Sequence, residues 1–393
     1  MLTLSVMYPR VVMNDLVLLR ERAGVAAYAG ELLHAMAGLE KSVRLDRLSE
    51  TPEGFPLRVA SRAYEGARRR SSGGSGARLA GWLVGSARTA GRSALAAYLR
   101  RAASLARWEL YHEPDAVPAD VGVPTIVTVH DLSVLRFPEW HPGHRVGHYE
   151  RRLGRGLDKA AAVIAVSEST RGDLERFVGV DPRRVTVIPE APRRVFRVLA
   201  KGRTASMRRR LGLPSTYFLF VGTIEPRKNI EGLLVAHAAL PESVRRRFPL
   251  VLAGGWGWGE ERVRDMLSRA PWRGVRHLGY LDDESLVAVC NGASALVYPS
   301  FHEGFGLPPL EAMACGVPVI SSSEGALAEV LGDAAVRIDP GDPESMGTAM
   351  RRLAEDQGER LALRERGLAH VSAFSWENAA KRTLRLYRDV LGG

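Results

Sequence analysis

The sequence predicts an α/β protein built from two halves, each with a parallel sheet covered by helices. The first observation is a series of short apolar runs, each followed by a stretch of helical composition. Continuous apolar strands that alternate with helices are typical of parallel sheets covered on both faces. The second observation is a break in this pattern near 189–202, which divides the 393 residues into two halves of similar size. That length also favours more than one hydrophobic core.

The expected strands end in polar or glycine-rich residues. An N-terminal run, MLTLSVMYPR, is expected to form the first strand, and further strands of the first half lie in 123–132, 161–170 and 184–192. Those of the second half lie in 217–229, 248–261, 274–284 and 293–306. Ser167 ends one of these runs and is a predicted helix N-cap. Because ligands bind beyond the carboxyl ends of parallel strands, we expect the functional side chains there.

Composition excludes several classes of protein. The chain has no run of 18 apolar residues, so we expect no transmembrane helix, and its N-terminus lacks the basic and apolar regions of a signal peptide. The two cysteines, Cys290 and Cys315, are too few for a disulfide framework and lack metal-ligand spacing. Both are expected to be buried thiols of a protein in a reducing, cytoplasmic compartment.

The formal charge of +11 is concentrated in one segment. Residues 58–107 contain eleven arginines and a single acid, Glu65, and the rest of the chain is close to neutral. Within it, a basic insert at about 62–107 carries Leu, Trp and Tyr at roughly helical spacing. Such a patch suits an anionic partner. We expect no nucleic acid, because the insert lacks interleaved aromatic residues and a recognisable module. Peripheral contact with an anionic membrane and a solvated insert remain as interpretations.

Two glutamates flank a glycine-rich turn in HEGFGLPPLEAMACGVPVI, residues 302–320. Glu303 falls in the loop after an expected strand, and Glu311 falls on a short helix whose first turn follows Gly306 and Leu307. Glycine lets the chain turn and approach a ligand closely, and the N–H groups of a first helical turn bind anions. Two acids beside an anion site suit the hydroxyls of a ribose and a sugar. The alternative is an exposed Glu303 and a Glu311 that serves only the helix dipole.

Cations precede another expected helix in VGTIEPRKN, residues 221–229. Arg227 and Lys228 stand before the helix, and Asn229 is its predicted cap. Cations at a helix N-terminus are unfavourable unless an anion lies between them and the helix. A diphosphate would resolve this conflict, whereas an ordinary solvated loop would leave it unresolved.

Three further candidate residues follow strands of the first half. His130 and Asp131, in TVHDL, come at the carboxyl end of a strand, where a histidine can hydrogen-bond a substrate across the crevice. A structural histidine is the alternative, and Asp131 either orients His130 or caps the next segment. Gly24, in RAGVAAYAG, begins an expected helix and would let a phosphate or sugar near the backbone, although this signal is weak by itself.

The sequence contains no Asp-x-Asp pair, which metal-dependent nucleotide-sugar enzymes normally use to hold their cation. We therefore expect no metal site and no cofactor, with Lys228, Arg227 and a helix N-terminus taking the cation's role.

These segments together resemble glycosyltransferase family 4, which consists of retaining enzymes of the GT-B fold. HEGFGLPPLEAMACGVPVI is similar to the family's E-x7-E signature, and VGTIEPRKN, VTVHDLSVLRFPEWHP, VIAVSESTRGDL and FSWENAAKRTLRLYRDV are similar to its other recurring segments. The resemblance covers most of the chain but not the basic insert. It implies two Rossmann-like domains whose parallel sheets face a central crevice. These are an acceptor-side domain at 1–195 and a nucleotide-sugar-binding domain at 200–374, and a final helix in 375–393 crosses back onto the first domain.

The resemblance also implies roles for four residues. Lys228 would hold the donor diphosphate, Glu311 would bind the nucleotide ribose, and Glu303 and His130 would act at the transferred sugar as the catalytic pair.

The sequence departs from the family pattern at three places. Thr223 stands where many members carry Arg, so diphosphate binding is expected to depend more on Arg227. The loop before Gly24 lacks a second glycine, and PEAP (189–192) replaces the usual PNG.

The predicted function is that of a retaining, metal-independent hexosyltransferase. It would use a nucleotide diphosphate sugar as co-substrate and a hydroxyl of a polysaccharide or glycolipid precursor as acceptor. HDLSVLRFPEWH and GTIEPRKN most resemble the mannosyltransferase-like branch, which favours GDP-mannose. The alternatives are a GT-B nucleotide-sugar epimerase and a non-catalytic binder of sugar nucleotides.

Overall fold

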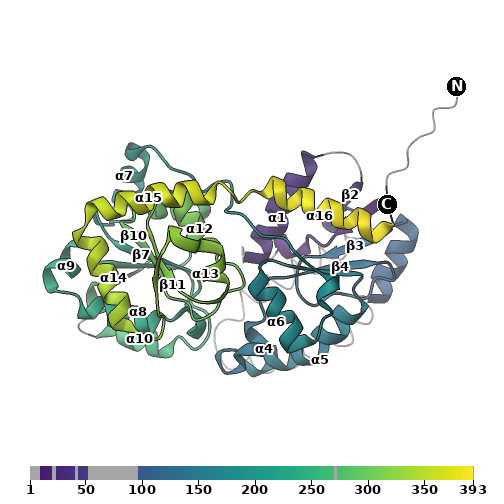
Figure 1. The fold of residues 1–393 in the computed structure, drawn as a ribbon, viewed down its shortest axis with the longest axis horizontal. Coiled ribbons are helices and arrows are strands. Elements are labelled where there is room, and N and C mark those ends of the chain that lie inside the picture. The colour runs from purple at the N-terminus through teal and green to yellow at the C-terminus, as the bar shows by residue number, and fades with distance from the viewer. Residues whose placement is uncertain (1–8, 20–23, 40–42, 52–95, 270–271, 393) are drawn as a thin grey trace.

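A computed structural model describes residues 9–19, 24–39, 43–51, 96–269 and 272–392, which form two α/β halves (Figure 1). The first described strand begins at Arg10, so the strand expected at MLTLSVMYPR starts later than predicted, and residues 1–8 lie outside the described part. Residues 62–95 of the basic insert expected at 62–107 also lie outside the described part. Residues 96–106 of the insert are described and form a helix.

The N-terminal half contains a six-stranded sheet with the order β2-β1-β3-β4-β5-β6, and all of its strand pairs are parallel. Its strands are β1 (Arg10–Met13), β2 (Arg44–Arg47), β3 (Leu110–Glu113), β4 (Thr125–Val129), β5 (Ala162–Ala165) and β6 (Val185–Val187). The strand order reverses direction between β1 and β3, as in flavodoxin-like sheets.

The C-terminal half contains a second six-stranded parallel sheet with the order β12-β11-β10-β7-β8-β9. Its strands are β7 (Phe218–Val221), β8 (Leu250–Ala253), β9 (Arg276–His277), β10 (Ala295–Tyr298), β11 (Val319–Ser322) and β12 (Val336–Ile338). This is the Rossmann order, with its switch point between β7 and β10. The predicted pair of Rossmann-like domains is thus confirmed.

Helices connect the strands and cover the sheets (Figure 1). In the N-terminal half these are α1 (Gly24–Ala37), α4 (Ser133–Arg136), α5 (Gly143–Lys159) and α6 (Glu168–Val178). In the C-terminal half they are α7 (Lys201–Arg210), α8 (Ile230–Ala239), α9 (Glu242–Arg247), α10 (Glu261–Ser268), α11 (Asp283–Gly292), α12 (Leu307–Ala314), α13 (Gly325–Leu331), α14 (Pro343–Glu355) and α15 (Gln357–Val371). Short 3-10 turns are η1 (Leu16–Leu19), η2 (Leu48–Glu50), η3 (Pro138–Trp140), η4 (Pro182–Arg184), η5 (Pro226–Lys228), η6 (Trp272–Gly274) and η7 (Gly332–Ala334).

The last helix, α16 (Trp376–Leu391), runs back across the N-terminal half beside α1 (Figure 1). Trp376 and Tyr387 are buried in one core cluster with residues of α1, β1 and β3. The hydroxyl of Tyr387 lies 2.6 Å from Nδ1 of His112 on β3, and the indole of Trp376 donates to the carbonyl of Pro192 at 3.1 Å. A helix distant in sequence is therefore held to the first sheet by both apolar packing and buried hydrogen bonds.

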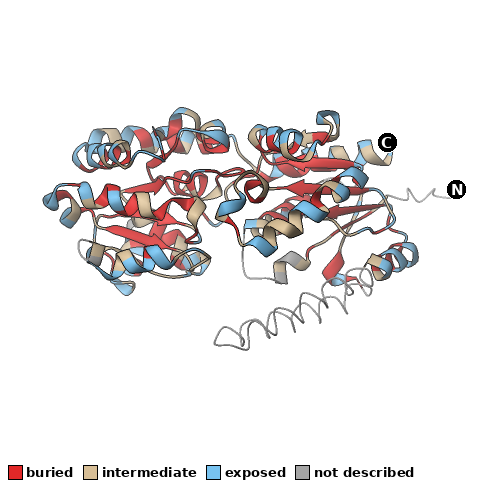
Figure 2. Ribbon diagram, turned by 90° about the horizontal axis from the view of Figure 1, so that it is seen from below, coloured by how far each residue is buried: buried red, intermediate tan, exposed pale blue. Residues whose placement is uncertain are grey.

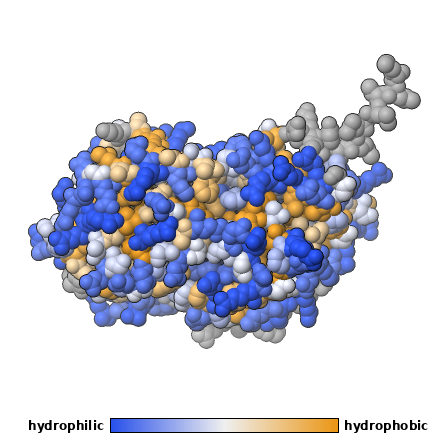
Figure 3. Space-filling view, viewed as in Figure 1, coloured by the Kyte–Doolittle hydropathy of each residue, from blue (hydrophilic) through white to orange (hydrophobic). Residues whose placement is uncertain are grey.

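The cores lie between the sheets and their helices, where the strands are buried and the outer helix faces are exposed (Figure 2). On the face seen in Figure 3, hydrophilic residues cover most of the surface, with hydrophobic residues interspersed in both halves. Among the described residues, no helix is long and apolar enough to cross a membrane. The C-terminal part of the basic insert joins the core, because Leu99 packs in a cluster with Val12 and Tyr111.

Candidate active site

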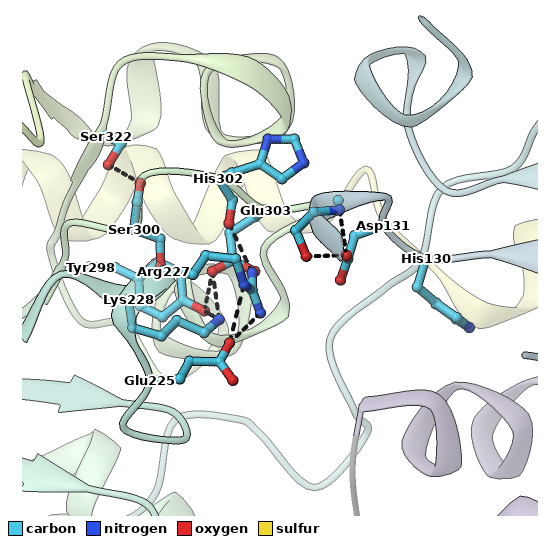
Figure 4. Close-up of polar contacts among 12 residues, drawn as sticks. His130, Asp131, Glu225, Arg227, Lys228, Tyr298, Ser300, His302, Glu303 and Ser322 are labelled. Atoms are coloured by element: carbon cyan, nitrogen blue, oxygen red, sulfur yellow. Dashed lines mark hydrogen bonds and ion pairs between the residues drawn. The ribbon is translucent and has the colours of Figure 1, made fainter. Parts of the chain in front are cut away.

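The switch point of the second sheet brings two separate loops together. The loop after β7 carries Arg227 and Lys228 in η5, and the loop after β10 carries Glu303. Because β7 and β10 are adjacent and parallel, their carboxyl ends open at the same edge of the sheet. The three charged side chains meet there (Figure 4).

Lys228 is buried and paired with Glu303. Its Nζ lies 2.5 Å from Oε1 of Glu303, and it also donates a hydrogen bond of 2.7 Å to the hydroxyl of Tyr298. Burial and the neighbouring Arg227 lower the pKa of Lys228, while the charge of Glu303 acts in the opposite direction.

Arg227 binds the other oxygen of the same carboxylate. Its Nη1 lies 2.6 Å from Oε2 of Glu303, and its Nη2 lies 2.8 Å from Oε1 of Glu225. Burial by itself raises the pKa of Glu303, but the charges of Arg227 and Lys228 outweigh it and lower this pKa to about 2. The carboxylate of Glu303 is therefore ionised at neutral pH.

In this structure the carboxylates of Glu225 and Glu303 lie beside Arg227 and Lys228. The diphosphate expected from the sequence stays a prediction. Asn229 caps α8 as predicted, because its side chain accepts the N–H of Gly232.

Glu311 lies on α12 and has a different partner. Both of its oxygens accept hydrogen bonds from Arg193, at 2.6 Å from Nε and 3.1 Å from Nη2, and Arg193 also contacts Asp283 at 2.9 Å. Burial raises the pKa of Glu311 and the guanidinium of Arg193 opposes this rise. The two glutamates of the E-x7-E segment therefore belong to two separate ion-pair networks.

Gly306 and Leu307 form the start of α12. Gly306 has a φ of 111°, which favours glycine, and precedes the helix as its N-cap. Pro308 and Pro309 follow Leu307 and have no N–H group. Of the first three residues of this helix, only Leu307 can therefore donate a backbone hydrogen bond to an anion.

The loop that carries Glu303 touches the N-terminal half. A Cβ added at Gly304 would lie 1.6 Å from the carbonyl oxygen of His130, so no other residue fits there. The carbonyl of Gly304 accepts hydrogen bonds from the hydroxyls of Ser167 at 2.7 Å and Thr170 at 3.1 Å. This glycine thus permits a close approach, as the sequence predicted, but to the backbone of the other half.

His130 and Asp131 follow β4, at the edge of the first sheet that faces this loop. Asp131 accepts hydrogen bonds from the N–H and the hydroxyl of Ser133, and so caps the next turn. Burial raises the pKa of Asp131, but the charge of Arg227 from the other half and the Ser133 hydrogen bonds outweigh it and lower this pKa. Figure 4 shows Asp131 between His130 and the cluster around Arg227.

Gly24 lies at the first residue of α1, as expected. A Cβ added there would meet no protein atom within 4 Å in the described structure, so no packing contact requires this glycine. The expected approach of a phosphate or sugar stays a prediction.

Family models match both halves of the chain. The model described as "Glycosyltransferase Family 4" matches residues 24–191, and the model "Glycosyl transferases group 1" matches residues 205–370. O-antigen chain mannosyltransferase B of Escherichia coli is 37% identical over 289 residues, which cover 71% of this chain and 74% of that protein. The chain belongs to glycosyltransferase family 4.

Other relatives of this glycosyltransferase differ in length. The serotype-specific mannosyltransferase WbdA of Escherichia coli is 33% identical over 288 residues, 70% of this chain but only 35% of WbdA. The D-inositol 3-phosphate glycosyltransferase of Salinispora arenicola is 31% identical over 288 residues, 69% of this chain and 64% of that protein.

Solved structures share the GT-B fold. Sucrose-phosphate synthase of Thermosynechococcus elongatus superposes with a TM-score of 0.70 and 20% identity, covering 98% of this chain and 99% of that one. HepE of Anabaena in complex with UDP-glucose superposes with a TM-score of 0.70 and 16% identity, covering 97% and 99% of the two chains. At these identities the likeness concerns the fold alone.

Sequence reasoning missed two residues of the glycosyltransferase site. Glu190 and Arg193 both lie in the linker after β6, where Glu190 contacts His130 and Arg193 contacts Glu311. The replacement of PNG by PEAP was the available signal for Glu190. No local pattern marks Arg193, because its partner lies 118 residues away.

Further contacts join the two halves beside the site. The carboxylate of Glu329 on α13 accepts the N–H groups of Glu168 and Ser169 at the start of α6, at 2.8 and 2.9 Å. The indole of Trp258 donates to the carbonyl of Trp140 at 2.6 Å. Polar contacts therefore join the two halves beside the site in this structure.

Proposed function

We propose that this glycosyltransferase transfers a hexose, mannose in preference, from a nucleotide diphosphate sugar to an acceptor hydroxyl, with retention and without a metal ion. The observation that carries the proposal is the buried cluster of Arg227, Lys228 and Glu303 at the switch point of the second sheet. It combines two cations for a diphosphate with one carboxylate that stays ionised.

Relatives support the choice of donor. The 37% identical mannosyltransferase B favours mannose, and the complex of HepE with UDP-glucose supports a nucleotide sugar as the donor class. Since the first relative acts on an O-antigen chain by its name, we propose a polysaccharide or glycolipid precursor as the acceptor.

The proposed role of each residue follows from its charge. Lys228 and Arg227 would bind the diphosphate and stabilise the negative charge that it gains as it leaves. Glu303 would face the positive charge that develops on the sugar ring, where a carboxylate with a pKa of about 2 is fully ionised. Glu311 would accept hydrogen bonds from the ribose with lone pairs that Arg193 leaves available.

The proposed step breaks the bond between C1 of the sugar and the phosphate oxygen, and forms one between C1 and the acceptor oxygen. Retention follows if the acceptor attacks on the face from which the diphosphate leaves. The acceptor hydroxyl then gives its proton to the departing phosphate oxygen. This route needs no protein nucleophile.

A donor screen tests the proposal. The purified chain is incubated with GDP-mannose, UDP-glucose, UDP-N-acetylglucosamine and dTDP-rhamnose, with and without short mannosides, and the released nucleotide is measured. We expect GDP release that acceptor mannosides stimulate, and a product whose anomeric configuration by NMR equals that of the donor. Conversion of the sugar nucleotide without an acceptor indicates an epimerase instead, and calorimetric binding without turnover indicates a non-catalytic binder.

We also propose that the basic insert at 62–107 brings the enzyme to an anionic membrane surface. Its support is the local charge of the sequence, with eleven arginines and one acid in 58–107. An acceptor held at a membrane would suit such a placement.

A further inference from the structure

His130 is held at both of its ring nitrogens. Nδ1 lies 2.8 Å from Oε1 of Glu190, which follows β6, and Nε2 lies 2.9 Å from the carbonyl oxygen of Pro114, which follows β3. The ring of Tyr28, from α1, packs edge-on at 4.8 Å between centroids. Three different elements therefore fix the position of this imidazole, and Glu190 is itself buried.

The contact with Pro114 fixes one hydrogen of the ring. A carbonyl oxygen can only accept a hydrogen bond, so Nε2 of His130 carries a hydrogen. The contact at Nδ1 needs one hydrogen between Nδ1 and Glu190. If that hydrogen is on Nδ1, the imidazole is positively charged and Glu190 is the matching anion.

Other charged and titratable groups face His130 from the elements around it. Asp115 follows β3, His112 lies on β3, Tyr28 lies on α1, and Asp131 is its neighbour in the chain. Burial alone lowers the pKa of His130, but the hydrogen bond and the charge of Glu190 lead the effects that raise it above its ordinary value of 6.5. Burial lowers the pKa of the neighbouring His112 to about 3, so that ring is neutral.

We propose that Glu190 is a positioning residue that holds His130 as an imidazolium cation at the carboxyl end of β4. This inference rests on the proposed function for its consequence in the reaction. The backbone of His130 abuts Gly304, next to Glu303, whereas its ring is turned towards Glu190 and Pro114 (Figure 4). A fixed positive charge there would act on the diphosphate through its electric field, without direct contact, and would stabilise the charge that moves onto it.

The protonation of His130 can be measured without any donor. The full chain is labelled with ¹⁵N-histidine, His130 is assigned with a His130→Gln variant, and its ring nitrogens are followed by NMR from pH 5 to 9. We expect Glu190→Gln, which keeps the size and an accepting oxygen, to lower the pKa of His130 by about 1 to 3 units, the usual effect of a close opposite charge. Glu190→Asp, which keeps the charge, should restore part of the shift.

Glu150→Gln serves as the matched control, because Glu150 is exposed on α5 of the same half. It should leave the pKa of His130 unchanged. An equal His130 pKa in the parent chain and in Glu190→Gln, with both folded by circular dichroism, overturns the proposal.

Kinetics then test the consequence in turnover. A group with a raised pKa is charged below that pKa and loses its charge as the pH rises through it, so the loss of kcat at alkaline pH should begin at lower pH in Glu190→Gln. The change in the pH at which kcat begins to fall should equal the change in the His130 pKa measured by NMR. The substitution should affect kcat more than KM. A shifted NMR titration with an unchanged pH profile shows that the charge of His130 plays no part in transfer. If no donor is turned over at all, the proposed function is wrong, but the NMR result still shows whether Glu190 and His130 form an ion pair.

Discussion

Lys228 and Glu303 form a buried ion pair, with Nζ 2.5 Å from Oε1, between loops that follow neighbouring strands of the second sheet. The same carboxylate binds Arg227, so a single acid holds both cations that we assign to the diphosphate. A donor diphosphate bound as proposed would therefore compete with these contacts or add to them. This relationship makes the charged cluster the best place to test the proposed function.

Lys228→Ala should weaken donor binding and slow transfer. A charge-assisted hydrogen bond to phosphate contributes about 1.5–3 kcal/mol, so kcat/KM should fall at least about tenfold. Steady-state kinetics with the donor from the screen measure this, and Lys159→Ala, at an exposed lysine of α5, is the control. Unaltered kinetics in Lys228→Ala show that the lysine does not bind the diphosphate.

Substitutions of the two glutamates of the E-x7-E segment should change different kinetic constants. Glu311→Gln should mainly raise the donor KM, because a ribose contact is similar in the ground and transition states and uniform binding does not accelerate the reaction. Glu303→Gln should mainly lower kcat, because its charge matters most as the sugar becomes positive. Calorimetry with the free nucleoside diphosphate complements the kinetics. Loss of nucleotide binding in Glu303→Gln alone means that the two roles are reversed.

Protonation of Glu303 should account for part of the decrease in the free energy of unfolding at low pH. Its folded-state pKa, about 2, lies below its ordinary value of 4.5, so its ion pairs contribute stability above about pH 4.5. That contribution should be lost as the pH falls towards 2. Urea unfolding at pH 6, 5, 4 and 3 should give a smaller decrease in the free energy of unfolding for Glu303→Gln than for the parent chain. Glu344→Gln, at an exposed position of α14, should follow the parent curve, and equal slopes for all three chains refute this account.

Transfer should survive chelation. The sequence has no Asp-x-Asp pair, and we assign to Arg227 and Lys228 the role that a metal cation would have at the diphosphate. Enzyme prepared and assayed in EDTA should keep its activity, while a metal-dependent glycosyltransferase assayed beside it should lose activity. A loss that magnesium or manganese restores contradicts the metal-free proposal.

The basic insert should bind anionic vesicles. Each basic residue near such a surface contributes roughly 1 kcal/mol, so replacing Arg68, Arg69 and Arg70 with Glu should strongly reduce flotation with phosphatidylglycerol liposomes. The test uses substitutions because a deletion extending into 96–106 would remove the buried Leu99 and disturb the core.

The matched control changes the same number of charges elsewhere, with Arg208, Arg209 and Arg210 of α7 replaced by Glu. Equal flotation of both triple variants and the parent chain contradicts a membrane role for the insert.

The sequence by itself determined the local features of this glycosyltransferase. The apolar runs predicted two parallel sheets, since strands buried on both faces must be apolar along their whole length. Helix caps at Ser167 and Asn229 were also predictable, because each bonds a backbone N–H only three residues ahead. The placement of Arg227, Lys228 and Glu303 at strand ends followed from the same pattern.

Only the tertiary structure decided how these residues pair. Lys228 meets Glu303 across 75 residues, His130 meets Glu190 across 60, and Arg193 meets Glu311 across 118. Such contacts depend on strand order and on the path of the linker, which side-chain periodicity does not encode. For this reason no pattern in the sequence indicated that Lys228 pairs with a carboxylate of the same chain, or that Glu303 and Glu311 bind different arginines.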